Sequence, residues 1–140
     1  MDIARRAALA ATVAFIINAI IRIAVQSAVD VPQGFEPFAW PPIFFATLIG
    51  VAGGAIVYAA LARFLGDRAN TIFRWVSYSL LVLSFATPII LLLSVPPQYP
   101  GTTPLTAAAL ELMHISTAVS TVVCLTRKRA KARSGILEPS

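Results

Sequence analysis

The sequence contains few charged residues and few of the residue types that build catalytic or metal centres. Of its 140 residues, 12% are charged, one is cysteine and one is histidine. A single cysteine excludes an intrachain disulfide and a cysteine-based redox or metal pair. Glu111 and His114 have the Glu-x-x-His spacing of carboxylate-bridged di-metal bundles, but such a centre needs a second copy of this element and further inward carboxylates. We therefore expect neither a metal nor a cofactor.

Motifs of the common enzyme classes are also missing. The sequence contains no phosphate-binding loop, no nucleophile elbow and no zincin motif. A lone glutamate and a lone histidine offer an acid and a base, but no activated nucleophile accompanies them. We therefore predict that the protein is not an enzyme, and an intramembrane enzyme is only the third hypothesis.

Apolar residues dominate what is present. They form 58% of the chain, and the mean hydropathy of +0.81 is too high for a soluble domain of this length. Four apolar stretches, at residues 7–29, 43–62, 73–95 and 105–125, each approach the ~20 residues that a membrane-spanning helix needs. The sequence predicts an all-α polytopic membrane protein: one domain, residues 1–140, forming an up-down-up-down bundle of four transmembrane helices.

Basic residues predict the orientation. They precede the first stretch, flank the middle connection and follow the last stretch: Arg5, Arg6, Arg63, Arg68, Arg74, Arg127, Lys128, Arg129, Lys131 and Arg133. The connections at 30–42 and 96–104 contain none, so the positive-inside rule places both termini in the cytoplasm. A cleaved signal peptide is the alternative for the first stretch, but Arg22 interrupts its apolar core. We predict a multi-pass protein of the bacterial cytoplasmic (inner) membrane.

The net charge of +5 is therefore a topology signal, and we expect no nucleic-acid partner. The basic tail at residues 126–140 is predicted to contact anionic lipid headgroups. Aromatic residues near the ends of the stretches are predicted to lie in two interfacial belts. They are Phe35, Phe38, Trp40, Phe64, Phe73, Trp75, Tyr78 and Tyr99.

Small residues line one side of the second stretch. Ala46, Gly50 and Gly54 recur every four residues, which lets the backbones of two helices approach closely. Two interpretations stay open, namely contact with a neighbour in the same bundle and a homo-oligomer interface. In the third stretch, Pro88 is predicted to kink the helix.

Polar residues in the first and last stretches are the candidate site. Arg22 and Glu111 each lie about seven residues, or roughly 10 Å, from the outward end of their stretch. Asn18 and His114 lie about one turn deeper, each on the same side of its helix as its neighbour. Ionisable groups are costly in lipid, so they need a partner or a task. We predict an ion pair between Arg22 and Glu111, extended by hydrogen bonds from Asn18 and His114.

Three interpretations of these residues stay open. The pair can be structural, it can form a binding site, or Arg22 can reach outward toward Asp30 or Glu36 instead. The leading functional hypothesis is a non-enzymatic packing or accessory subunit of a larger membrane complex, or a homo-oligomer. The alternative is a protein that binds or transports a small ligand, an anion or a proton through the polar cluster.

The last stretch contains the one motif-like element, Leu112-Met113-His114, within the run ALELMHISTAV. With the four-span plan, the basic ends and the glycine-rich second stretch, the chain resembles a domain-of-unknown-function family of small four-helix bacterial integral membrane proteins. The resemblance implies four transmembrane helices and brings no known activity.

Overall fold

The computed structural model describes residues 2–31, 34–94 and 102–127, and these residues contain helices and connections but no strand. The predicted all-α class is confirmed for this part of the chain. The helices are α1 (Ile3–Ala28), η1 (Glu36–Phe38), α2 (Trp40–Leu65), η2 (Gly66–Arg68), α3 (Ala69–Ser84), α4 (Ala86–Ser94) and α5 (Pro104–Thr126). Tyr99 and the basic tail beyond Arg127 lie outside the described residues.

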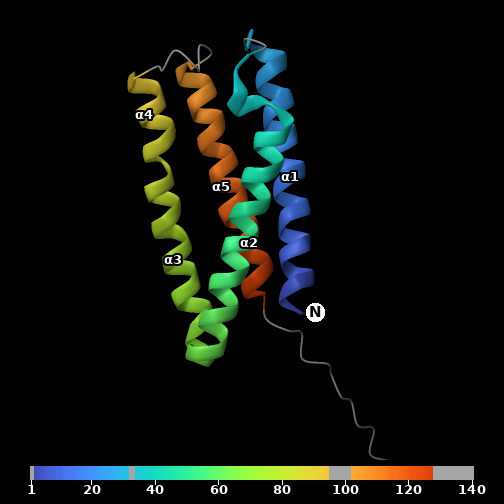
Figure 1. Ribbon diagram of the computed structural model, residues 1–140, viewed down its shortest axis with the longest axis vertical. Helices are drawn as coiled ribbons and strands as arrows, with labels where there is room; N and C mark the ends of the chain where they lie inside the picture. Colours follow the sequence, from blue (N-terminus) through green and yellow to red (C-terminus); the bar gives the residue numbers. More distant parts are fainter. Residues whose placement is uncertain (1, 32–33, 95–101, 128–140) are drawn as a thin grey trace, which may run out of the picture.

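Three helical segments are long and apolar enough to cross a membrane. They are Ile3–Ala28, the continuous helical run Trp40–Ser94 and Pro104–Thr126. The run from Trp40 reverses direction at η2, so that α2 and α3 lie side by side in Figure 1. The structure therefore supports a membrane protein built from apolar helices.

Local sequence explains where the helices begin and end. The Asp2 side chain accepts a hydrogen bond from the Arg5 amide (2.8 Å) and caps α1. Thr103 and Thr106 form a capping box at the start of α5, just before Pro104 in its first turn. Gly66 has φ +52°, a left-handed conformation that favours glycine, and it ends α2 where the chain turns into α3.

The third apolar stretch is broken as predicted. Helix α3 ends at Ser84 and α4 begins at Ala86, two residues before Pro88. Proline has no amide hydrogen for the carbonyl four residues earlier, which interrupts the helical ladder at this point. The Ser84 hydroxyl donates instead to the carbonyl of Leu81 (2.7 Å).

Helix α5 is the centre of the arrangement. It contacts α1, α2, α3 and α4, and it lies beside α1 along most of its length. Helices α2 and α3 meet at η2 and separate toward the end of the molecule that holds α4 (Figure 1).

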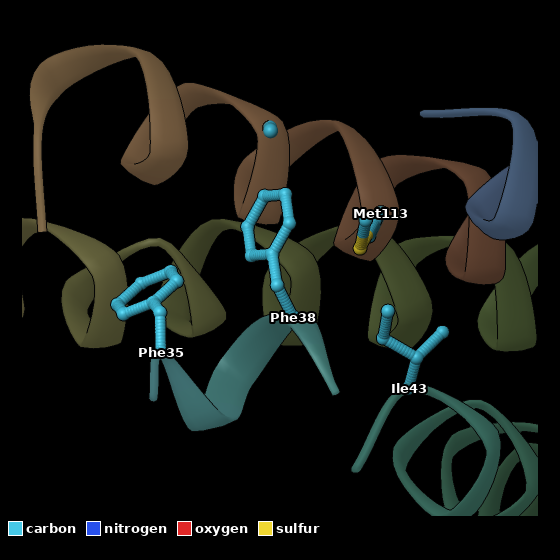
Figure 2. Packing of buried hydrophobic residues seen from close by; sticks show 5 residues of the cluster. Phe35, Phe38, Ile43 and Met113 are labelled. Carbon is cyan, nitrogen blue, oxygen red and sulfur yellow. The ribbon is translucent and has the colours of Figure 1, made fainter. Parts of the chain in front are cut away.

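Buried side chains form two clusters at opposite ends of α5. One contains Phe35, Phe38, Ile43, Ala109 and Met113, and Figure 2 shows η1 carrying Phe38 toward α5. The other contains Tyr58, Phe73, Val122 and Leu125.

Burial of aromatic side chains corrects part of the interfacial prediction. Phe35, Phe38 and Phe73 are buried in the clusters, whereas the prediction placed them at the membrane surface. Their rings fill the space between neighbouring helices. A sequence pattern does not show which aromatic residues will be buried in this way. Trp40, Phe64, Trp75 and Tyr78 are exposed, as interfacial anchors would be.

Candidate functional site

Asn18 lies at a buried polar junction of α1, α2 and α5, with 2% of its surface exposed. Its Nδ2 donates to Thr47 Oγ1 (2.9 Å) and Thr117 Oγ1 (3.2 Å), and its Oδ1 accepts from the Ser116 hydroxyl. All the hydrogen-bonding groups of the Asn18 side chain are therefore satisfied. This junction joins three helices, and neither Arg22 nor His114 takes part in it.

The hydroxyl oxygens of Thr47 and Thr117 accept hydrogen bonds from Asn18, because each hydroxyl proton is already donated to a backbone carbonyl. Thr47 donates to the carbonyl of Ile43 (2.7 Å) and Thr117 donates to that of Met113 (2.9 Å). A threonine that bonds back to its own helix keeps its lone pairs for a neighbour. Sequence reasoning missed Thr47, because a lone threonine in an apolar helix gives no signal of its partner.

Arg22 bonds to the chain segment that connects α1 to α2. Its Nε donates to the carbonyl oxygen of Phe38 (2.6 Å), and its guanidinium carbon lies 4.1 Å from the centroid of the Trp40 ring. Arg22 forms no ion pair with Glu111, so that prediction is wrong. The physical reason is that η1 brings the backbone acceptor of Phe38 to the guanidinium, and the start of α2 brings the aromatic face of Trp40.

Glu111 and His114 keep unpartnered atoms on α5. Glu111 Oε2 and His114 Nδ1 are both buried and have no hydrogen-bond partner. Buried polar atoms are paired in the great majority of cases, so each unpaired one calls for an explanation. The predicted four-residue cluster is thus divided into the Asn18 junction, the Arg22–Trp40 contact and these two groups on α5.

A cavity of about 720 Å³ lies between α2, the α3–α4 segment and α5. Its wall is mainly apolar, and its polar members are Asn18, Thr47, Ser77, Ser84, Thr87, His114, Thr117 and Thr121. This volume and this mixture of many apolar and few polar groups are typical of small-molecule sites. Of the predicted site residues, His114 and Asn18 line the cavity, while Arg22 and Glu111 do not.

The cavity has an open side. Ile49 on α2 and Leu80 on α3 both line it, and they are 70% and 57% exposed. Both side chains belong to apolar helices, so the opening faces laterally, between α2 and α3. A ligand can therefore approach from the side of the helices.

The small residues of α2 lie at the cavity and against α5. A Cβ added to Gly50 would lie 3.3 Å from Thr117 Cγ2, and one added to Gly54 would lie 2.7 Å from Thr121 Cγ2. Ala46 lines the cavity and is exposed. We retain a helix-packing role for Ala46, Gly50 and Gly54 as a prediction, and substitution tests it.

The described residues hold no group of three or more His, Cys, Asp or Glu side chains that could bind a metal ion. Cys124 is a free, half-buried thiol near the end of α5.

The chain belongs to a family of unknown function, DUF6069, whose model matches residues 2–131. The predicted resemblance to a domain-of-unknown-function family is confirmed. No curated protein and no solved structure matches the chain. The family description assigns no activity, and any function rests on the geometry of the site.

Proposed function

We propose that this member of the DUF6069 family is a four-span integral membrane protein that binds a small, mainly apolar molecule in the cavity between α2, α3, α4 and α5. In this proposal α1, α2, the α3–α4 segment and α5 each cross the membrane once. Helices α1, α2 and α5 have 26, 26 and 23 residues, enough for ~30 Å of hydrocarbon at ~1.5 Å per residue.

Basic residues at one end of the molecule support a cytoplasmic location for that end. The N-terminus, η2 and the end of α5 lie at the same end in Figure 1, and η1 lies at the other. Arg6 Nη1 donates to the carbonyl of Leu125 (2.8 Å), and Arg74 Nη2 donates to Thr126 Oγ1 (3.3 Å). Positive charge near the C-terminus of a helix is favourable, and positive residues concentrate on the cytoplasmic side. We propose a bacterial inner membrane as the location.

The observation that carries the ligand proposal is the environment of His114. Its Nδ1 is a buried nitrogen without a partner, and the residue forms part of the wall of an apolar cavity. A molecule with an apolar body would fill the space, and a rotation of the imidazole would turn Nδ1, which is buried in this conformation, toward a hydrogen-bonding group of that molecule.

The cavity favours binding over a purely structural role. A packing subunit needs well-filled contacts, which the Asn18 junction and the two clusters supply, but it needs no space of this size. An accessory subunit or a homo-oligomer remains our second proposal, in which exposed apolar side chains of α2, such as Ile49 and Ile56, would lie at the interface. Native mass spectrometry in mild detergent reports stoichiometry and bound molecules together.

Cavity-filling variants test the proposal. Gly53 lines the cavity and has no atom within 4 Å of an added Cβ, so Gly53→Leu places a side chain in the space. Ala52→Leu, on the preceding residue of α2 and outside the wall, is the matched control. We expect a copurifying small molecule with the wild type and with Ala52→Leu, and its loss with Gly53→Leu.

His114→Leu tests the polar contact. It keeps an apolar wall and removes the nitrogen, so we expect weaker retention of the same molecule. Equal retention in wild type and Gly53→Leu, or no small molecule bound to any of these proteins, would refute the cavity as a binding site.

A further inference from the structure

We propose that Arg22 and Trp40 form a second site, which binds the phosphate of a membrane phospholipid on the η1 side of the membrane. This inference depends on the membrane topology proposed above, but not on the cavity ligand. The cavity wall contains neither residue.

Two contacts fix the guanidinium of Arg22. The Nε–Phe38 oxygen bond of 2.6 Å holds one edge, and the Trp40 ring, 4.1 Å away, covers one face. An arginine held in this way is already oriented for two parallel hydrogen bonds to an anion.

The other edge of the guanidinium is unoccupied. Within the described part of the chain, Nη1 and Nη2 of Arg22 have no hydrogen-bond or ion-pair partner. Neither nitrogen is buried, because the buried side-chain atoms that lack a partner there are Glu111 Oε2 and His114 Nδ1. Four N–H donors are therefore open to a group from outside the chain.

The surroundings of Arg22 indicate a lipid. Arg22 is half-buried within the apolar helix α1, whose outer side chains Ile20 and Ile23 are 61% and 56% exposed, so the charge belongs to a helix with an apolar outer surface. A positive charge at such a place needs an anionic partner, and phospholipid phosphates lie at the depth where tryptophans such as Trp40 are enriched.

A strip of aromatic rings continues from Trp40 toward the hydrocarbon. The ring of Phe15 lies 6.2 Å from that of Trp40 and 5.6 Å from that of Phe44, and Phe44 lies 5.4 Å from Phe45. Phe44 and Phe45 are exposed. Acyl chains can lie along this strip while the phosphate contacts Arg22, and this combination favours a phospholipid over a free phosphate ion.

The test measures lipid binding to the delipidated protein in detergent by native mass spectrometry. The probes are dioleoyl phosphatidylglycerol, dioleoylglycerol (which has the same chains without the phosphate) and inorganic phosphate. We expect wild-type protein to bind phosphatidylglycerol at least about tenfold more tightly than dioleoylglycerol, since a hydrogen bond to a charged group is lost with the phosphate. Millimolar inorganic phosphate should not displace the lipid.

Variants test whether Arg22 is the residue that binds the phosphate. Arg22→Gln keeps a donor for the Phe38 carbonyl but removes the charge, and we expect about tenfold weaker binding of phosphatidylglycerol. Arg5→Gln, an exposed arginine at the other end of α1, is the matched control and should bind like the wild type. Gly53→Leu should also bind phosphatidylglycerol normally, which separates this site from the cavity.

Three results would overturn the inference. Equal binding of phosphatidylglycerol and dioleoylglycerol to wild-type protein would remove the role of the phosphate, whatever the variants do. Unchanged binding in Arg22→Gln would remove the role of Arg22. Displacement by inorganic phosphate alone would identify a site for a soluble anion instead of a lipid.

Discussion

Thr121 occupies the place into which a side chain on Gly54 would extend. A Cβ at Gly54 would lie 2.7 Å from Thr121 Cγ2 and 3.8 Å from Phe73 Cζ. The first distance is too short for a real contact, so the backbone of α2 can lie this close to α5 only because residue 54 has no side chain. One turn away, Gly50 and Thr117 repeat the relationship at 3.3 Å.

Gly54→Ala should therefore lower the free energy of unfolding by about 1–3 kcal/mol, the usual cost of overpacking. Gly53→Ala is the control, because its Cβ would meet no atom within 4 Å. Detergent-unfolding titrations measure both. Adding Thr121→Ser to Gly54→Ala removes the clashing methyl group and should restore part of the loss. Equal stability of the two alanine variants would show that this contact does not limit helix packing.

Asn18→Leu should destabilise the protein by about 1–2 kcal/mol. Interhelical hydrogen bonds in membrane proteins contribute roughly 0.6 kcal/mol each on average, and Asn18 makes three of them. Gln26→Leu, two turns further along α1 at an exposed position, should change the free energy of unfolding little. A larger loss in Gln26→Leu than in Asn18→Leu would contradict the importance of the junction.

Losses from Arg22→Met and Glu111→Gln should add in the double variant. The two side chains share no partner, so their coupling free energy should stay below about 0.5 kcal/mol. A double-mutant cycle on unfolding free energies measures this. Coupling well above about 1 kcal/mol would mean that the ion pair predicted from the sequence does form in the membrane.

Thiol labelling in intact cells tests the proposed orientation. On a Cys124→Ser background, Gly34→Cys before η1 should react with an impermeant reagent, and Asp67→Cys in η2 should react only after permeabilisation. Both positions are exposed, whereas Ala69 is buried and would stay unlabelled on either side. Labelling of Asp67→Cys in intact cells, with Gly34→Cys labelled only after permeabilisation, would show that the topology is opposite to the one proposed.

Hydrophobic patterning predicted the helices well, because an apolar run of about 20 residues in lipid satisfies its backbone hydrogen bonds by forming a helix. Asp2, Thr103 and Pro104 mark helix starts through local chemistry that the chain itself carries. The break before Pro88 follows from the missing amide hydrogen in the same way. Features that depend on one residue and its near neighbours could therefore be read from the sequence.

Partners across the bundle could not be predicted in this way. The depth argument paired Arg22 with Glu111 because both lie at matching distances from the ends of their helices. It took no account of η1. The carbonyl oxygen of Phe38 in η1 accepts a hydrogen bond from Arg22, and the Phe38 ring packs in the cluster with Ala109 and Met113 of α5. A connection of irregular backbone can supply acceptors that helical periodicity does not represent. Thr47, the partner of Asn18, was missed for another reason, because a lone threonine in an apolar helix gives no signal of its partner.

The contact between α1 and α5 also sets an order of events during biosynthesis. Asn18 and Thr117 are 99 positions apart, and Arg6 and Leu125 are 119 positions apart. At about 5–20 residues per second, translation leaves Asn18 without its α5 partners for roughly 5–20 s after it emerges. During that interval Thr47, only 29 positions away, is its earlier partner. Until α5 is synthesised, the Asn18–Thr47 bond between α1 and α2 is therefore the part of the junction that can already form.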